Sequence, residues 1–337
     1  MPTEKKLILI GPPGVGKTSL RMTFFDGLLS KDLVGSPLEP TRRKDYREYT
    51  WLNLTVRCVD CPGQMLDRWH GQDEDATFLE TDAIIYMVEA DPSQRDPITT
   101  EYRRILISHA KYCPQAAIYV LIHKADLVPD DRKAEVLQTI STYITSEGLG
   151  PLTDKYGGII NAPPHPQAEF FLTSLIDGSA FDAMRKILNK YSRRGEAYQK
   201  VCDQLALSCG ITKGDILLIE QKTGFVVAEK TIGFPEASLV SSIQKGLLEL
   251  FKAARDKVAK EINQGTVDGH ILLCRDLQYM IAPIEDALLL GVLVPRTVQL
   301  GLLYFLVDKA CDLIQRLARI YGNAGTLETL AASMEKQ

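Results

Sequence analysis

The sequence lacks the features that would place the chain in a membrane or on a nucleic acid. No run of about 18 apolar residues occurs, so we expect no transmembrane helix. The net charge is −4 and no long basic stripe is present, which gives no support for nucleic-acid binding. The ends of the sequence show no signal-peptide pattern, no myristoylation glycine and no prenylation cysteine. We therefore expect a cytoplasmic protein that only its partners would recruit to a membrane surface.

The cysteines also lack the pattern of a zinc site or a set of disulfides. The chain has seven cysteines, an odd number, at positions 58, 61, 113, 202, 209, 274 and 311. Cys58 and Cys61 form a C-x₂-C, but no second pair accompanies them, which argues against a zinc site. Reduced, mostly buried thiols of a cytosolic protein fit this pattern best.

What the chain has in ordinary amounts indicates a globular protein of two domains. It contains 337 residues, of which 45% are hydrophobic and 24% charged. In the first half, strand-like runs alternate with helix-like segments, which predicts an α/β fold with a parallel sheet and helices on both faces. The expected strands are 6–10, 54–59, 83–89, 117–122 and 168–173, and the expected helices are 17–29, 95–112, 131–147 and 178–193. The Gly- and Pro-rich stretch 150–167 is expected to be an insertion loop.

The most informative motif lies at residues 11–18, which read Gly-Pro-Pro-Gly-Val-Gly-Lys-Thr. This P-loop spacing follows a strand-like run and leads into a helix-like segment. Glycines let backbone N–H groups turn inward around a triphosphate. Lys17 would reach the β- and γ-phosphates as a catalytic group, and the Thr18 hydroxyl would hold Mg²⁺. The predicted phosphate-binding residues are Gly11, Pro12, Pro13, Gly14, Val15, Gly16, Lys17, Thr18 and Ser19. A glycine-rich turn with a chance Lys-Thr is the alternative.

A second motif, Asp60-Cys61-Pro62-Gly63-Gln64, closes an extended apolar run. An acid at the end of such a strand can hold the Mg²⁺ shell. The N–H of Gly63 could bond the γ-phosphate, and Gln64 is placed to orient the attacking water. An ordinary strand and turn is the alternative, although the D-x-x-G spacing gains weight after a P-loop.

Two further motifs fit recognition of a guanine base. His123-Lys124-Ala125-Asp126 follows the apolar run 117–122. The Asp126 carboxylate could accept hydrogen bonds from N1–H and the 2-amino group of guanine. Adenine lacks both donors, so it would leave the buried carboxylate unpaired, and this penalty would select guanine. The stem of Lys124 could cover the base. The fourth motif, Thr173-Ser174-Leu175, means little alone, and a charged exit from a buried strand is the alternative for the third.

Together these residues resemble a small GTPase, and the details resemble the Rag/Gtr family. That family carries His-Lys-x-Asp where most GTPases have Asn-Lys-x-Asp, and an Asp-Cys-x-Gly-Gln loop. The run Lys17-Thr18-Ser19-Leu20-Arg21 is also similar to its Lys-Thr-Ser-Met-Arg. The resemblance covers roughly residues 5–190 and extends more weakly beyond. It implies that Thr173, Ser174 and Leu175 form the turn whose backbone N–H groups meet the guanine oxygen.

The family also has a switch threonine that binds Mg²⁺ when GTP is present. Thr41, 19 residues before Asp60, is the best match, and the alternatives are Thr50 or no such threonine. The predicted metal set is therefore Thr18, Thr41 and Asp60, with Mg²⁺ as cofactor and GTP or GDP as ligand. Pro13 departs from the usual glycine, removes one N–H and adds bulk. It could slow hydrolysis or hinder an arginine finger, or be a harmless variant.

The second half changes character after residues 192–195 and shows no catalytic constellation. Its pattern predicts a helix at 197–208, strands at 216–222 and 224–232, a long amphipathic helix at 238–262, strands at 270–275, 278–284 and 287–294, and a helix at 297–321. This order resembles the roadblock/longin fold, which Rag/Gtr proteins carry after the GTPase domain. The predicted domains are a GTPase domain at 1–193, a roadblock/longin-like dimerisation domain at 196–322 and a tail at 323–337. The last helix is apolar nearly all round, which fits a core position alone or a core position plus an interface.

The leading interpretation is a regulatory GTPase that hydrolyses GTP slowly and presents different loops to partners in its two states. The resemblance implies a homo- or heterodimer through the roadblock domain, with a roadblock-protein scaffold, an exchange factor and an activating protein as candidate partners. A nucleotide-binding scaffold that never cycles is a different class. Gln64 favours the interpretation as an enzyme, whereas Pro13 is compatible with the interpretation as a scaffold. A third class is an ATP-driven P-loop enzyme. Asp126 argues against it, because this carboxylate is expected to select guanine over adenine.

Overall fold

The chain forms two compact units, Met1–Ile187 and Leu188–Gln337, described here one at a time. The computed structural model describes residues 3–26, 33, 45–51, 54–61, 74–147, 152–153, 159–160, 168–208, 210–221, 226–233, 269–285 and 288–322. Three predicted site residues lie outside the described residues: Thr41, Gly63 and Gln64. The expected helix at 238–262 and the tail at 323–337 also lie outside them. The predicted domain ranges stay a prediction.

The first unit is built on a six-stranded sheet with the order β2-β3-β1-β4-β5-β8. Five strands are parallel: β1 (Thr3–Ile10), β3 (Leu54–Asp60), β4 (Ala83–Glu89), β5 (Ala117–His123) and β8 (Glu169–Thr173). All five strands were expected from their apolar runs. Because they run in the same direction, their carboxyl ends lie along one edge of the sheet, where ligands of such folds bind.

The sixth strand corrects the expectation of a purely parallel sheet. β2 (Asp45–Trp51) pairs antiparallel with β3 at the edge of the sheet. Its sequence, Asp-Tyr-Arg-Glu-Tyr-Thr-Trp, has no apolar run, and the side chains of Tyr46, Arg47 and Glu48 are exposed. An edge strand needs little apolar surface, so the search for buried runs missed it.

The helices of this unit largely follow the expected ranges. They are α1 (Lys17–Phe24), α4 (Glu74–Phe78), α5 (Arg95–Tyr112), α6 (Lys133–Glu147) and α7 (Ser179–Tyr191), with 3₁₀ turns at Pro92–Gln94, Ala125–Leu127 and Asp130–Arg132. α1 is shorter than the expected 17–29, and α4 was not expected. Within the expected insertion loop, the two-residue strands β6 (Leu152–Thr153) and β7 (Ile159–Ile160) pair antiparallel.

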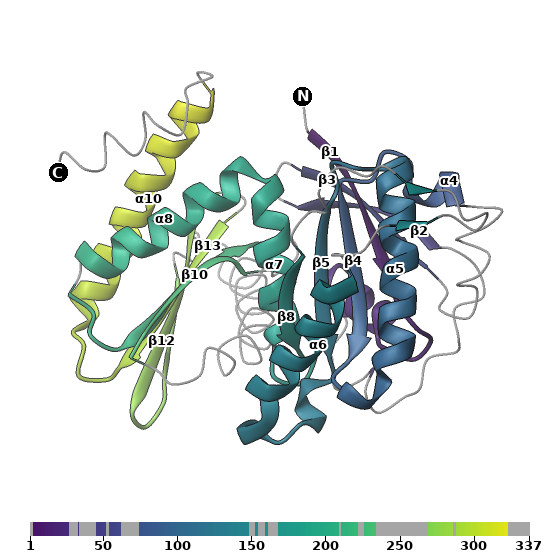
Figure 1. The fold of residues 1–337 in the computed structure, drawn as a ribbon. Helices are drawn as coiled ribbons and strands as arrows, with labels where there is room; N and C mark the ends of the chain where they lie inside the picture. Colours follow the sequence, from purple (N-terminus) through teal and green to yellow (C-terminus); the bar gives the residue numbers. More distant parts are fainter. Residues whose placement is uncertain are drawn as a thin grey trace. The chain divides into compact units, whose positions relative to one another are not determined.

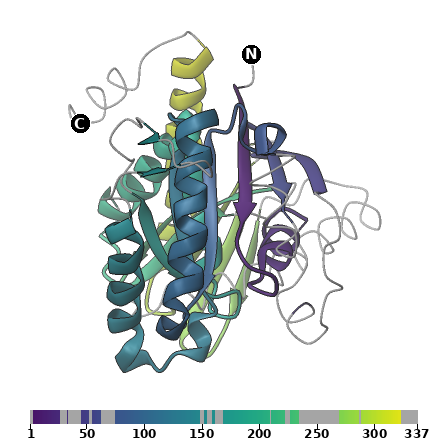
Figure 2. The ribbon, with the colours of Figure 1, turned by 45° about the vertical axis from the view of Figure 1, so that its right-hand side comes forward.

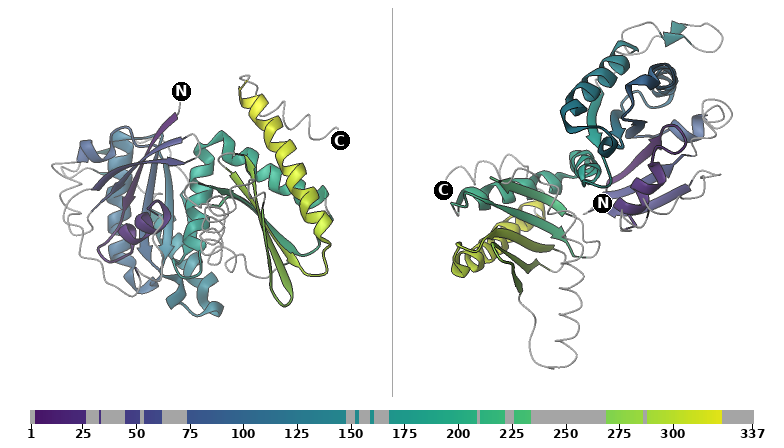
Figure 3. Two further views of the ribbon diagram at one scale, coloured as in Figure 1. Left: turned by 180° about the vertical axis from the view of Figure 1, so that it is seen from behind. Right: turned by 90° about the horizontal axis from the view of Figure 1, so that it is seen from below.

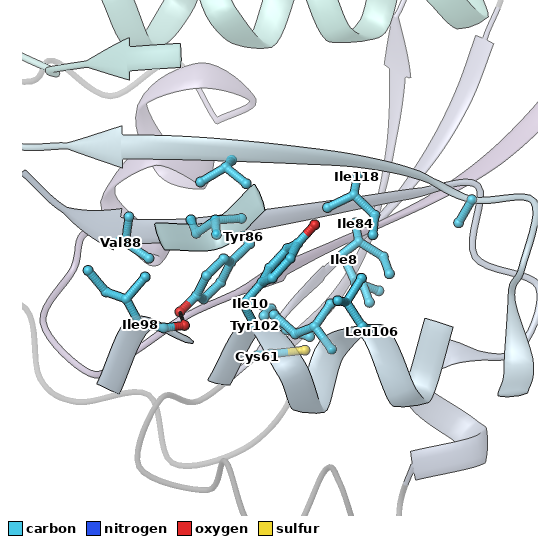
Figure 4. Packing of buried hydrophobic residues seen from close by; sticks show 14 of the residues in the cluster. Ile8, Ile10, Cys61, Ile84, Tyr86, Val88, Ile98, Tyr102, Leu106 and Ile118 are labelled. Carbon is cyan, nitrogen blue, oxygen red and sulfur yellow. Dashed lines mark hydrogen bonds between the residues drawn. The ribbon is translucent and has the colours of Figure 1, made fainter. Parts of the chain in front are cut away.

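Helices cover both faces of this sheet (Figures 1 and 2). One face packs on α5 and α6 through a buried cluster that includes Ile84, Tyr86 and Tyr102 (Figure 4). The Tyr86 hydroxyl in this cluster donates a 3.0 Å hydrogen bond to the carbonyl oxygen of Ile98. The other face carries α1 and α7, whose Phe24 and Phe181 rings are 5.9 Å apart (Figure 3, right). The central strands are therefore dry on both faces and hold their carboxyl ends rigidly.

The second unit contains a five-stranded antiparallel sheet with the order β10-β9-β13-β12-β11. Its described elements are α8 (Arg193–Ser208), β9 (Gly214–Glu220), β10 (Val226–Ile232), β11 (His270–Leu273), β12 (Leu277–Glu285), β13 (Leu288–Pro295) and α10 (Leu300–Gly322). The succession of helix, two strands, three strands and helix follows the predicted order. α8 starts four residues before the predicted helix at 197.

α8 and α10 pack on the same face of this second sheet (Figure 1). Leu303 and Leu306 on α10 are fully buried, whereas Leu300, Tyr304 and Phe305 on the same helix are 47%, 60% and 48% exposed. The helix is therefore a core element on one side and carries exposed apolar side chains on the other. Every helix in the described part of the chain is too short or too polar to cross a membrane.

Candidate nucleotide-binding site

The loop between β1 and α1 takes a conformation that depends on its glycines. Gly11 has φ 149°, and a Cβ there would lie 2.1 Å from the carbonyl oxygen of Met87, so the loop rests directly on β4. Gly16, with φ 104°, caps the start of α1, and Gly14 has φ 75°. L side chains rarely adopt these angles, so the loop can take this curled conformation only because these positions are glycine.

Lys17 lies inside this loop, as its motif predicted. Its side chain is buried, and its ammonium donates hydrogen bonds of 2.9 Å and 2.8 Å to the carbonyl oxygens of Gly11 and Pro12. Burial lowers the pKa of Lys17 to about 8, against the opposing effect of negative charges led by Asp60. The loop thus holds a cation at its centre. Of the other predicted phosphate-loop residues, Val15 is buried, Pro12, Thr18 and Ser19 are half-buried, and Pro13 and Gly14 are exposed.

Asp60, at the end of β3, is fully buried, yet neither carboxylate oxygen receives a hydrogen bond of ordinary geometry. Burial raises its pKa, and the Thr18 hydroxyl and the cations of Lys17 and Arg21 oppose this shift. A buried carboxylate whose oxygens receive no hydrogen bond of ordinary geometry requires an explanation, and a bound ion is one of the common ones. Oxygen ligands from a carboxylate and a threonine suit Mg²⁺, so Asp60 and Thr18 fit the predicted metal site.

The base end of the predicted site is joined to the phosphate loop through His123. The Thr173 hydroxyl donates to the Ile122 carbonyl oxygen at 3.4 Å, so it accepts from His123 Nδ1–H at 3.0 Å. Burial lowers the pKa of His123 to about 4, so its ring is neutral at pH 7 with Nε2 as an acceptor. A Cβ on Gly16 would lie 3.0 Å from this ring, which therefore packs against the phosphate loop.

Asp126, the carboxylate that the sequence predicts to select guanine, is held by the fourth motif. The Ser174 hydroxyl donates a hydrogen bond to Asp126 Oδ1 and accepts one from the backbone N–H of Ile176 at 3.0 Å. Leu175 is buried beside them. We expected Asp126 to be a buried carboxylate, but the side chain lies in an exposed position at the rim of the sheet. A bound base would therefore have to shield the Asp126 carboxylate from water.

Sequence reasoning missed two partners in this region. Lys124 takes the left-handed φ of 63° and forms a 2.5 Å ion pair with Glu89 at the end of β4. Arg21, one helical turn after Lys17, lies 3.6 Å from Asp60. Glu89 closes an apolar strand next to the third motif in the sheet, a signal that could have found it. Arg21 stands in the quoted Lys-Thr-Ser-Leu-Arg run, where we gave it no role.

The described residues of all four motifs thus meet at one edge of the sheet, at the ends of β1, β3, β5 and β8. The structure brings Gly16, His123 and Thr173 into contact and holds Asp126 through Ser174. Thr41, Gly63 and Gln64 lie outside the described residues.

Known proteins resemble the part of the sequence that carries these motifs. The family model for the Gtr1/RagA G protein conserved region matches residues 6–239. The chain is 27% identical to the GTP-binding protein GTR1 of Saccharomyces cerevisiae over 188 residues, 55% of this chain and 56% of the relative. It is 32% identical to the GTP-binding protein gtr1 of Schizosaccharomyces pombe over 149 residues, 40% of this chain and 47% of the relative. The match thus spans about half the length of these two relatives.

Among solved structures, Myxococcus xanthus MglB shares 17% identity and a TM-score of 0.32, covering 38% of this chain and 92% of that chain. The second unit is an α+β unit by its own order of elements and its five-stranded antiparallel sheet. The fold expected from the sequence, an α/β GTPase domain followed by an α+β unit, is confirmed. The family model covers more than half of the sequence, and the chain belongs to the Gtr1/RagA G protein family.

Proposed function

We propose that this protein is a regulatory GTPase of the Rag/Gtr kind that binds GTP and GDP with Mg²⁺, hydrolyses GTP slowly and dimerises through its second unit. The observation that carries the proposal is the contact of His123 with both Gly16 and Thr173. This contact joins the phosphate loop to the two loops that would hold a base. A site of this extent suits a whole nucleotide rather than phosphate alone. The names of the two relatives, "GTP-binding protein", agree with it.

Guanine is the base that we assign to the site. Asp126 presents a carboxylate whose second oxygen is not engaged by Ser174, and carboxylates accept from adjacent N–H donors. Guanine offers two such donors on one edge, whereas adenine offers an acceptor there. Adenine would therefore leave the Asp126 carboxylate covered and unpaired.

Magnesium would be held by Thr18 and Asp60, with Thr41 joining them when GTP is bound. A Mg²⁺ ion held by these residues would supply positive charge against the negative charge that develops on the transferred phosphoryl group. Lys17 would provide a second positive charge from inside the loop. Gln64 would orient the attacking water. Thr18, Thr41, Asp60, Lys17 and Gln64 would together form the reaction centre.

Slow hydrolysis is proposed from Pro13. Its ring stands exposed at the mouth of the loop and supplies no backbone N–H to the phosphates. Slow turnover suits a switch, because the GTP state then lasts long enough to be read by partners. The experiment is single-turnover hydrolysis of GTP by the parent and by Gln64→Leu. We expect slow conversion in the parent and a clearly slower reaction in the variant. Equal rates would remove Gln64 from the mechanism.

Dimerisation is assigned to the second unit on the strength of its apolar exposure and its sheet edge. β11 lies at the edge of the sheet, and its Leu272 and Leu273 are 40% and 56% exposed. The side chains of Tyr304 and Phe305 on α10 are also exposed. An edge strand with exposed apolar side chains favours pairing with a second chain. Native mass measurement of the full chain tests this: a strictly monomeric protein without any copurifying subunit would contradict it.

A non-cycling, nucleotide-binding scaffold is the second candidate. Exposed Pro13 at the phosphate loop is the observation that favours it. The same single-turnover assay separates the two, because a scaffold would retain GTP unhydrolysed over many hours. Extraction of nucleotide from the purified protein adds a second criterion. A cycling enzyme is expected to yield GDP, and a scaffold would yield intact GTP.

A further inference from the structure

Two aspartates stand opposite each other beside the candidate magnesium site. Asp45 begins β2 and Asp60 ends β3, and the two residues are register partners in the antiparallel pair. Like charges directly opposite each other across two strands repel and destabilise the pairing. Burial makes the repulsion stronger at Asp60, which is shielded from water. A cation that reaches both carboxylates would remove this strain.

Arg21 supplies that cation from α1. Its side chain is 4% exposed, and its guanidinium lies with Nη2 3.4 Å from Asp45 Oδ2 and Nε 3.6 Å from Asp60 Oδ2. The distance to Asp60 is that of an ion pair without a hydrogen bond. Arginine suits this task because its planar fork presents several N–H groups in fixed directions, whereas lysine offers one point charge.

A second set of contacts fixes the direction of the guanidinium. Arg21 Nη1 donates to Asp26 Oδ2 at 2.7 Å and to the Tyr49 hydroxyl oxygen at 2.8 Å. The Tyr49 hydroxyl in turn donates to Asp26 Oδ1 at 3.0 Å, and the Tyr49 ring stacks on Phe25 with the ring centroids 4.4 Å apart. One side of the Arg21 guanidinium therefore bonds residues at the end of α1 and in β2. The other side faces Asp60.

We propose that Arg21 is a positioning residue for the magnesium site: its guanidinium offsets the repulsion between Asp45 and Asp60 and so holds the Asp60 carboxylate in place. The inference rests on the proposed function, because that function assigns Asp60 to Mg²⁺. In sequence, Asp45 follows Thr41 and Asp60 precedes Gln64. One guanidinium thus joins the strand ends next to both predicted switch segments, and links the metal site to β2.

The test measures how firmly the full-length protein holds a fluorescent GDP as free Mg²⁺ is varied. We expect Arg21→Gln to raise the Mg²⁺ concentration for half-maximal retention by about tenfold, the effect typical of losing a group that orients a metal ligand. Adding Asp45→Asn to this variant removes the repulsion on Asp60, so it should recover most of the loss. A general packing defect at Arg21 would not be repaired by neutralising Asp45.

The matched control is Arg47→Gln. Arg47 Nε donates to Asp45 Oδ2 at 3.0 Å, but its side chain is 49% exposed and it belongs to β2 itself. This variant removes a cation from Asp45 without touching Asp60, and its Mg²⁺ midpoint should equal that of the parent. If Arg21→Gln fails to fold, Arg21→Lys takes its place, and its midpoint should lie above the parent's.

The outcomes separate this inference from the proposed function. If Asp60→Ala and the parent hold GDP with the same Mg²⁺ dependence, the metal assignment itself is wrong. If the parent depends on Mg²⁺ and Asp60→Ala abolishes this, but Arg21→Gln leaves the midpoint unchanged or lower, the positioning role of Arg21 is wrong. Failure of Asp45→Asn to recover the Arg21→Gln midpoint would also overturn it.

Discussion

The imidazole of His123 packs directly against Gly16, where an added Cβ would lie 3.0 Å from Cδ2 and 3.1 Å from Nε2 of the ring. The residue that ends β5 therefore limits the size of the residue that opens α1. Because His123 also bonds Thr173 at the end of β8, a change at Gly16 should be felt at the base end of the site as well.

Replacing Gly16 with alanine tests this contact. The variant would place a methyl group against the ring and force an L residue to φ 104°, which costs on the order of 1–2 kcal/mol before the clash is counted. We expect nucleotide binding to be lost or strongly weakened. Gly14→Ala is the matched control, since Gly14 also has a positive φ but no atom within 4 Å of the added Cβ. Equal effects of the two variants on GDP affinity, by calorimetry, would refute the role of the His123 contact.

The buried, neutral His123 predicts acid sensitivity. Its pKa of about 4 lies below the ordinary 6.5, so between these values the unfolded chain binds more protons and stability falls as the pH falls. The stability lost by pH 4 should be roughly 3 kcal/mol. His123→Asn, which restores the residue most GTPases carry, should remove this part of the pH dependence. Urea unfolding at pH 7 and pH 4.5 measures it, and an unchanged difference in the variant would contradict the prediction.

Lys17 predicts a loss of nucleotide affinity in mild alkali. With a pKa of about 8 in the free site, lowered by burial, its ammonium loses its proton as the pH rises through 8, whereas bound phosphate would keep it charged. GDP affinity should therefore be constant below about pH 7.5 and fall roughly fivefold from pH 8 to pH 9. Lys17→Met should bind weakly and show no such step. A step of equal size in Lys17→Met would assign the titration to another group.

Thr18 predicts a difference between the two nucleotide states. In Thr18→Asn the hydroxyl that would hold Mg²⁺ is absent, and the GTP state relies on the metal more than the GDP state does. Affinity for Mg²⁺-GTP should fall more than affinity for Mg²⁺-GDP. Thr18→Ser keeps a hydroxyl and serves as control, with both affinities near those of the parent. If Thr18→Asn binds Mg²⁺-GTP as the parent does, Thr18 is not a metal ligand.

The sequence predicted the parts of this molecule that are encoded by local pattern. Apolar runs located β1, β3, β4, β5 and β8, and the motifs at their ends placed Lys17 and Asp60 at one edge. β2 escaped because an exposed edge strand carries no such run. The exposure of Asp126 also escaped, because the ending of an apolar strand does not reveal how far the next loop projects.

Contacts between distant segments lay beyond the reach of local pattern. Arg21 meets Asp45 and Asp60 only because β2 folds back on β3, so no spacing in the sequence could announce the cluster. The division of α10 into a buried side and an exposed side was likewise not predictable from local pattern. Its nearly continuous apolar residues fit burial on all sides, and only the packed sheet shows that Leu306 is buried while Phe305 is exposed.

The most direct test of the account is the base preference of the parent and of Asp126→Asn, measured by competition among GTP, ATP and xanthosine triphosphate. The parent should prefer GTP over both. In the variant, the amide N–H would face the donors of guanine but could donate to the C2 carbonyl of xanthine, so GTP affinity should fall about 100-fold or more while xanthosine triphosphate gains. A parent that binds ATP as well as GTP, or a variant that keeps its GTP affinity, would contradict the central claim that this is a guanine-nucleotide site.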